Sequence, residues 1–161
     1  MIRPAIKEEA KILTKISFES KGYWSYPKEY FDIWKNELSI RPEYIEENVV
    51  YVYEEGGEIL GYYSIVELRE NVQLSGIKIK KGFWLEHMFV VPRNIGQGIG
   101  TKLFNHLRKW CQSNEVYELG ILADPHSIGF YEKKGCDYQR EYPSTIANRT
   151  TPLFVFKIKN R

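Results

Sequence analysis

The chain has 161 residues, enough for one domain with a substantial core, and we expect a single domain over residues 1 to 161. Its 23 Lys and Arg against 21 Asp and Glu leave a formal charge of +2, which gives no electrostatic argument for a nucleic-acid partner. No segment approaches the roughly 18 apolar residues of a membrane-spanning helix, and the N-terminus lacks a signal-peptide core. Cys111 and Cys136 lack metal-ligand spacing, so we expect reduced structural thiols, no metal and a cytoplasmic protein.

The first 40 residues predict a strand followed by two helices. Residues 2 to 6 form a short strand, and residues 7 to 20 place apolar side chains at helical spacing. Gly22 and Pro27 interrupt this helix, and Pro27 suits the first turn of a second one. The second helix carries its large apolar side chains on one face: Tyr30, Phe31, Trp34 and Leu38.

The middle of the chain predicts strands. Residues 48 to 68 read as a hairpin, because β-branched and aromatic runs flank a turn at Gly56 and Gly57. Residues 71 to 82 form a polar connection or a further small hairpin, with its lysines on a solvated edge. Residues 83 to 91 are apolar on both faces, as in a central strand that is covered on both sides.

The C-terminal half alternates helices and strands. A helix is predicted from residue 99 to about 113, then a strand at 116 to 124, then a short helix capped by Asp124 and ended by Gly135. Two final strands follow. The resulting order, β-α-α-β-β-β-α-β-α-β-β, predicts an α/β or α+β fold with a mixed sheet and helices on both faces.

Gly96, Gly98 and Gly100 stand between a predicted strand and a predicted helix. The unsatisfied N–H groups and the dipole of a helix N-terminus favour an anion, and glycines let a phosphate approach the backbone. A Walker loop is excluded because Thr101-Lys102 has the wrong order after the last glycine. A dinucleotide fingerprint needs G-x-G-x-x-G, whereas this turn is G-x-G-x-G.

The segment "VVPRNIGQGIGTKLF" resembles the acyl-CoA pyrophosphate loop of the GNAT family of N-acetyltransferases. Ile95 departs from the family pattern, which usually has Arg or Gln there, and Arg93 stands two residues too early to replace it. The matching residues are Val90, Pro92, Gly96, Gly98 and Gly100.

A later segment, "DPHSIGFYEKKGC", resembles the family's short helix that ends in Tyr-Glu-Lys-x-Gly-Phe. Asp124 replaces the usual Asn and Cys136 the usual Phe, while residues 131 to 135 are intact. The resemblance extends over residues 1 to 159 in the family's order.

This resemblance implies an acyl-CoA N-acyltransferase fold with a mixed, mostly antiparallel sheet of about six or seven strands. It implies transfer of an acetyl group from acetyl-CoA, the co-substrate, to a primary amine of a small molecule or peptide, directly in a ternary complex. Two alternatives stay open: a non-catalytic acyl-CoA-binding or regulatory module, and a transferase for a longer acyl group. A homodimer also stays open.

The family's functional residues map onto matching positions. The resemblance implies that the strand end would bind the thioester carbonyl and pantetheine through Met88, Phe89, Val90 and Val91. It implies that the turn would bind the pyrophosphate through Gly96, Gln97, Gly98, Ile99, Gly100 and Thr101. Tyr131 is expected to act as general acid toward the CoA sulfur, because a phenol stays protonated at neutral pH. Asp124 either lies near the pantetheine or caps its helix.

The next candidates are the general base and the residues that would bind the acceptor amine. Glu86 is expected to be either the general base, directly or through water, or an ion-paired residue of the sheet face. His87 is expected in the core, His106 in solvent, and His126 as a cap or rim residue. The acceptor site implied by the resemblance would use aromatic side chains to hold a cationic amine, although these could equally serve as hydrophobic packing: Tyr23, Trp24, Tyr26 and Tyr30.

Overall fold

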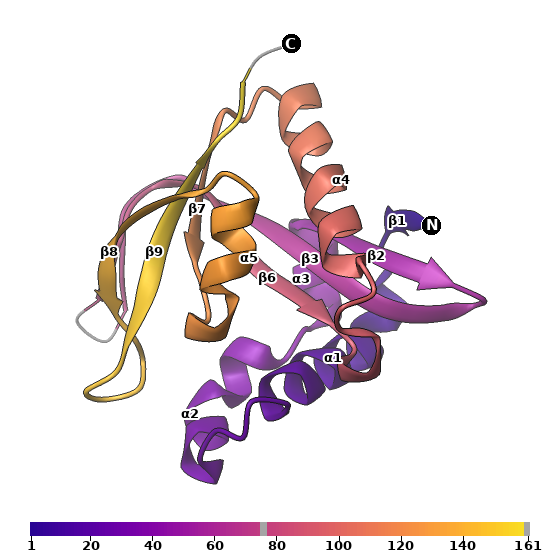
Figure 1. The fold of residues 1–161 in the computed structure, drawn as a ribbon, viewed down its shortest axis with the longest axis horizontal. Coiled ribbons are helices and arrows are strands. Elements are labelled where there is room, and N and C mark those ends of the chain that lie inside the picture. The colour runs from indigo at the N-terminus through magenta and orange to yellow at the C-terminus, as the bar shows by residue number, and fades with distance from the viewer. Residues whose placement is uncertain (75–76, 160–161) are drawn as a thin grey trace. The chain divides into compact units, whose positions relative to one another are not determined.

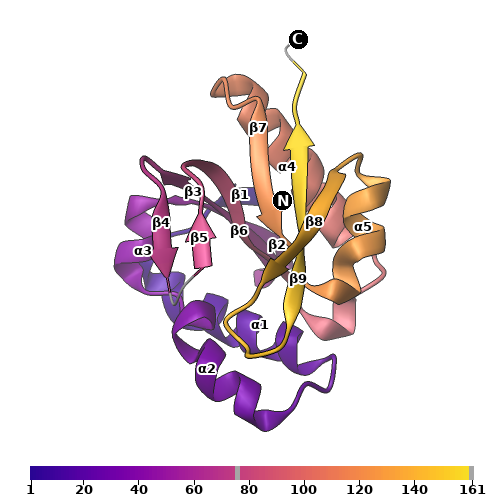
Figure 2. The same cartoon turned by 90° about the vertical axis from the view of Figure 1, so that its left-hand side faces the viewer.

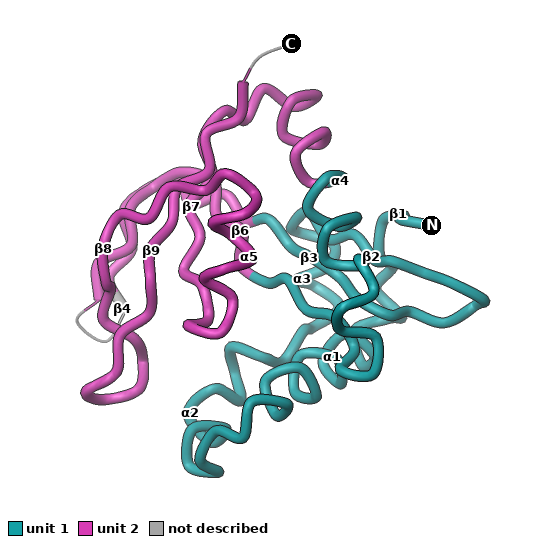
Figure 3. Tube along the Cα trace, in the orientation of Figure 1, with its two compact units in different colours: residues 1–65, 87–106 teal, residues 66–86, 107–161 magenta. Residues whose placement is uncertain are grey.

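A computed structural model describes residues 1–74 and 77–159. The chain divides into two compact units, residues 1–65 with 87–106 and residues 66–86 with 107–161 (Figure 3). We call them the first and the second unit. Three elements run from one unit into the other: β3 (Glu58–Leu68), β6 (Gly82–Val90) and α4 (Ile99–Ser113).

Seven strands form one sheet in the order β1-β2-β3-β6-β7-β9-β8 (Figures 1 and 2). β6 pairs with β7 in parallel, whereas β1 with β2, β2 with β3, β7 with β9 and β8 with β9 are antiparallel. The mixed, mostly antiparallel sheet is therefore confirmed. The strands not yet given bounds are β1 (Ile2–Pro4), β2 (Val49–Glu55), β7 (Glu118–Leu122), β8 (Asp137–Pro143) and β9 (Thr150–Lys157).

The first unit packs α1 (Ala10–Gly22) and α3 (Pro42–Glu47) against β2 and the end of β6. Apolar side chains at helical spacing on α1 meet the inward face of β2, and burying them supplies the driving force for this half of the fold. The core cluster consists of Ala10, Leu13, Ile16, Ile40, Ile45, Val50, Val52, Tyr62 and Val91.

α2 (Lys28–Leu38) follows α1 as predicted, and Pro27 is its N-cap residue. Its buried residues, Trp34 and Leu38, belong to the predicted apolar face. α3 was not predicted. Its six residues contain too few apolar positions for a helical period to emerge, although Pro42 at its first position is a start signal.

The second unit contains β7, β9 and β8 side by side (Figure 2). A 3-10 turn, Pro125–Ser127, leads into α5 (Ile128–Lys133), and Gly135 follows with φ +84°, as expected of a helix stop. β4 (Val72–Leu74) and β5 (Ile77–Ile79) pair as the further small hairpin. Its lysines, Lys78, Lys80 and Lys81, are exposed.

Both cysteines are free and buried, as predicted, and burial raises the pKa of each thiol to about 12. Within residues 1–74 and 77–159, no group of three or more His, Cys, Asp or Glu side chains is placed to hold a metal ion. In the same part of the chain, every helix is too short or too polar to cross a membrane.

Candidate active site

The glycine turn of the first unit combines left-handed backbone with open space. Gly96 has φ +85° and Gly98 has φ +83°, conformations that side chains with a Cβ rarely adopt. A Cβ built at either residue would meet no atom within 4 Å. Glycine is therefore favoured at both positions by the backbone conformation. Neighbouring atoms would leave room for a larger residue. The surface above the turn is free for a ligand to approach.

α4 begins directly after this turn. The Lys102 N–H donates to the Gly98 carbonyl at 3.0 Å, which closes the first helical turn. The amides of Ile99 and Gly100 lie in that turn, where an α-helix cannot satisfy its own N–H groups and its dipole favours an anion. Gly100 has a different role from the other glycines, because it is helical.

Side chains brace the turn and leave Ile95 outside. The Asn94 amide donates to Gln97 Oε1 at 3.0 Å across the turn. Arg93 is paired with Glu58 at the start of β3, so its guanidinium is held by an acid of the hairpin. Ile95 is 43% exposed. The Ile99 side chain is buried, and only its amide can serve a ligand.

The end of β6 directs its backbone groups to two edges. The Val91 N–H donates to the Leu60 carbonyl of β3 at 2.8 Å, and the Phe89 carbonyl also faces β3 at Gly61. Strand alternation then places the N–H groups of Met88 and Val90 on the opposite edge. On the other side of β6, the register with β7 consists of two pairs, Trp84↔Gly120 and Leu85↔Ile121.

Residue Ser20 on α1 reaches this same strand end. Its hydroxyl donates to the Val90 carbonyl at 2.5 Å, and Ser20 is only 8% exposed. The Val90 carbonyl points to the same edge of β6 as the N–H groups of Met88 and Val90. The bond from Ser20 therefore fixes the orientation of that edge. The sequence gives no sign of this contact, since Ser20 is one of several polar residues at the end of a helix.

Tyr131 lies in α5 of the second unit and is 7% exposed. Its ring packs edge-on against Phe130 at 5.2 Å between centroids and tilted against Phe154 at 5.9 Å. Burial, with smaller contributions from Cys136 and Asp124, raises the pKa of its phenol well above the ordinary value. Tyr131 therefore remains a proton-bearing group through the neutral and mildly alkaline range.

Asp124 caps the turn that leads into α5. Its Oδ1 accepts the backbone N–H of His126 at 2.9 Å, and the ring Nδ1 of His126 lies 2.9 Å from the same oxygen. The capping alternative for Asp124 is thus confirmed. His126 stands at the surface with 40% of its side chain exposed, as a cap or rim residue would.

Two neighbouring titratable residues of β6, Glu86 and His87, differ in exposure. Glu86 is exposed, so its charge on an otherwise apolar strand costs little. His87 is 8% exposed and lies in the core, as predicted, with ring centroids of Tyr44 at 5.9 Å and Tyr62 at 6.2 Å.

The prediction for His106 was wrong. It is half-buried, its Nδ1 lies 2.9 Å from the Tyr63 hydroxyl, and its ring centroid is 4.5 Å from that of Tyr51. The helical period placed His106 beside the apolar stripe of α4, on its polar side. Aromatic residues of β2 and β3 extend far enough to cover that side as well, which only long-range packing decides.

The four aromatic residues predicted for the acceptor site separate into two groups. Tyr23 and Trp24 are 50% and 39% exposed, and their rings meet edge-on at 4.8 Å between centroids. Tyr26 and Tyr30 are half-buried and both turn their rings toward Trp34, at 5.1 and 5.4 Å. The first group is exposed to solvent, and the second forms an aromatic cluster with Trp34.

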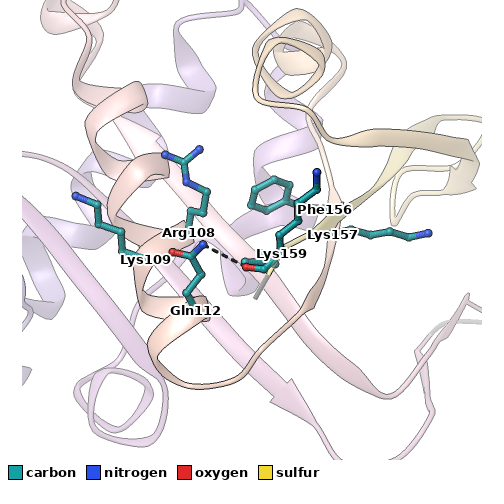
Figure 4. A pocket seen from close by; sticks show the side chains of 7 residues that line it. Arg108, Lys109, Gln112, Phe156, Lys157 and Lys159 are labelled. Atoms are coloured by element: carbon teal, nitrogen blue, oxygen red, sulfur yellow. Dashed lines mark hydrogen bonds between the residues drawn. The ribbon is translucent and has the colours of Figure 1, made fainter. Parts of the chain in front are cut away.

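A surface cleft of the second unit is lined by four cationic residues (Figure 4). The Gln112 amide donates to the Lys159 carbonyl at 3.2 Å across it. None of the predicted site residues lines this cleft. Its lining consists of Arg108, Lys109, Gln112, Phe156, Lys157, Ile158 and Lys159.

The mixed sheet and the glycine turn that opens on α4 agree with the acyl-CoA N-acyltransferase fold that the sequence resemblance implies. Comparison with known proteins agrees: residues 13–136 match the acetyltransferase (GNAT) family. The chain belongs to that family, and it is an acetyl-CoA-dependent N-acetyltransferase.

The chain shares no more than 28% sequence identity with each of three individual relatives. The peptidyl-lysine N-acetyltransferase YiaC of Escherichia coli (strain K12) is 28% identical over 149 residues, which cover 88% of this chain and 89% of YiaC. The PaiA N-acetyltransferase of Thermoplasma acidophilum, solved with coenzyme A, is 15% identical with a TM-score of 0.76, over 98% of both chains. A GNAT acetyltransferase of Brucella melitensis, solved with acetyl-CoA, is 18% identical with a TM-score of 0.62, over 99% of this chain and 88% of that one.

Proposed function

We propose that the protein transfers the acetyl group of acetyl-CoA directly to a primary amine of a peptide or small molecule, within a ternary complex. The observation that carries this proposal is the turn at Gly96 and Gly98, whose left-handed backbone and open surface precede the N-terminus of α4. A lysine side chain of a peptide is the first acceptor to test, because a relative of 28% identity is named a peptidyl-lysine N-acetyltransferase. We take residues 1–161 as one catalytic domain.

The backbone performs the binding steps of the proposed mechanism. The amides of residues 96–101 hold the pyrophosphate, as the helix dipole and the glycine turn favour. Met88 and Val90 direct their N–H groups to the edge of β6 away from β3, where they donate to the thioester carbonyl. Such donors stabilise the negative charge that develops on this oxygen when the amine attacks. Phe89 and Val91 fix the strand by packing in the first unit's core.

Two side chains handle the protons. Glu86 takes a proton from the acceptor ammonium, directly or through a water molecule, so that the neutral amine can form the new N–C bond. The C–S bond then breaks, the nitrogen that has formed the new N–C bond loses its second proton to water, and Tyr131 donates its phenolic proton to the departing sulfur. Because burial raises the pKa of Tyr131, the phenol acts first as a hydrogen-bond donor to the developing thiolate and recovers a lost proton readily. Asp124 supports Tyr131 indirectly, by capping the 3-10 turn that leads into its helix.

Thiol release from acetyl-CoA across a panel of amines tests the proposal. The panel holds lysine peptides, peptides with free N-termini and small alkylamines. Tyr131→Phe is expected to lower kcat roughly 100-fold or more, with nearly unchanged CoA affinity, because it removes a proton donor and leaves the fold. Tyr142→Phe, at a second buried tyrosine of the same unit, is the matched control and should retain turnover. Unchanged turnover in Tyr131→Phe removes this residue from the acid role.

Ile95 favours a second candidate, a non-catalytic acyl-CoA-binding module. An exposed isoleucine stands where the family usually has Arg or Gln, so one side-chain contact to the cofactor is replaced. The same panel separates the two functions, since micromolar CoA binding without thiol release from any amine would support the binding module. Repeating it with longer acyl-CoA substrates tests the transferase for a longer acyl group.

A further inference from the structure

A lysine in the last turn of α1 lies against two aromatic rings, one in the connection to α2 and one on α2. Lys21 Nζ lies 4.5 Å from the ring centroid of Trp34 and 5.6 Å from that of Tyr26. Trp34 and Tyr26 meet edge-on at 5.1 Å, and we call these two rings the aromatic cage. Tyr30 packs edge-on against Trp34 at 5.4 Å and so supports the cage wall.

The cage has the chemistry of an alkylammonium site. The face of an aromatic ring attracts a cation through its quadrupole, and it does so more strongly where water is excluded. Trp34 is only 3% exposed, and Lys21, whose ammonium lies over this ring, is itself half-buried. Ring faces accept any ammonium group of suitable size and do not depend on the identity of the chain that carries it.

The resident cation lies at the end of α1, next to the connection to α2. Lys21 occupies the last turn of α1 and has a long side chain with several rotatable bonds, and Gly22 directly follows it. Ser25 in the same connection has φ +57°, a conformation that costs free energy in a residue other than glycine. Next to it, Tyr23 and Trp24 expose large rings of the kind that mark ligand-binding surfaces.

We propose that the aromatic cage is a binding site for an alkylammonium group of the acceptor, and that Lys21 fills it as an internal competitor until the acceptor arrives. This inference rests on the proposed acetyltransferase function and narrows its acceptor to amines that bring a cation to this site. A site that its own lysine occupies nine-tenths of the time binds an external cation about tenfold more weakly than the vacant site. Lys21 thereby excludes weakly binding cations.

The test is a calorimetric titration with n-butylammonium chloride at constant ionic strength, without CoA. Lys21→Ala vacates the cage and is expected to bind n-butylammonium at least tenfold more tightly than the unmodified protein. Lys21→Arg keeps a cation that stacks on aromatic rings and is expected to bind as weakly as the unmodified protein. Lys15→Ala, at an exposed lysine of the same helix, is the matched control and should leave binding unchanged.

Two further measurements assign the site. Neutral n-butanol should show no gain with Lys21→Ala, because the gain depends on charge. Adding Tyr26→Leu to Lys21→Ala should remove the gain, and circular dichroism checks that this variant is folded. Equal n-butylammonium binding by Lys21→Ala and the unmodified protein would overturn the inference. Since no acetyl transfer is measured, that result is distinct from a failure of the proposed function, which the thiol-release panel reports.

Discussion

The hydroxyl of Ser20 donates to the carbonyl oxygen of Val90 at 2.5 Å and joins the last turns of α1 to the end of β6. Val90 ends the strand whose Met88 and Val90 amides are proposed to bind the thioester. The first helix therefore supports the geometry of a site to which it supplies no direct ligand in the proposed mechanism.

Ser20→Ala is expected to lower the free energy of unfolding by about 1–3 kcal/mol, because it leaves the Val90 carbonyl without its buried donor. It should also raise the KM for acetyl-CoA, since the edge of β6 loses its anchor. Urea unfolding and steady-state kinetics measure the two effects. Ser39→Ala, which removes an exposed hydroxyl bonded to the Lys35 carbonyl, is the matched control. Equal effects from both variants would contradict a special role for Ser20.

Gly98→Val is expected to abolish CoA binding. A β-branched side chain at φ +83° strains the backbone and fills the space that a pyrophosphate would occupy. Gly57→Val in the β2–β3 turn is a close control, because Gly57 has φ +79° and equally open surroundings. Both variants should lose stability by about 1–2 kcal/mol. Only Gly98→Val should lose the CoA signal in calorimetry; retained binding there contradicts the assignment of the turn.

Gly120→Ala is expected to destabilise the second unit by about 1–3 kcal/mol, since overpacking forces its neighbours to shift. Its Cβ would lie 2.7 Å from ring carbons of Trp84, which covers β7 at this position. Gly129→Ala on α5 is the control, because a Cβ there meets no atom within 4 Å and alanine favours a helix. Denaturant unfolding compares them, and a neutral Gly120→Ala would show that Trp84 moves aside freely.

The buried thiols predict an alkaline loss of stability. Unfolded cysteine titrates near pH ~8.5, whereas burial raises the pKa of Cys111 and Cys136 to about 12. Above pH ~8.5 the folded chain keeps protons that the unfolded chain releases, so the free energy of unfolding falls as pH rises, by at most ~1.4 kcal/mol per pH unit for each thiol. Urea midpoints at pH 7.5 and 9.5 measure this fall.

Replacing both cysteines by alanine should reduce the difference between the two midpoints, whatever its effect on stability at pH 7.5. A difference that persists unchanged would assign the alkaline loss to other groups. In the native protein, both thiols should also react slowly with a disulfide reagent at pH 7.5, because a thiolate is the reactive form and burial disfavours it.

Local patterns were sufficient for several features of the candidate site. The cap at Asp124, the stop at Gly135 and the glycine turn at residues 96 to 100 depend on residues adjacent in sequence, and each was predicted; the left-handed backbone of Gly96 and Gly98 is a finding of the structure. The role of Tyr131 as general acid stays a prediction. Its burial against Phe154 of β9 supplies the raised pKa that no local pattern could indicate.

The sequence by itself determined the family, the strand and helix order apart from α3, and the glycine turn, because backbone conformation and hydrophobic period are encoded within a few neighbouring residues. Only the tertiary structure decided that His106 meets Tyr63, that Ser20 holds Val90 and that Lys21 lies over Trp34. Each of these contacts joins different elements across intervening chain. Its partners are selected by packing and by the need to satisfy buried polar groups, which no spacing along one segment can express.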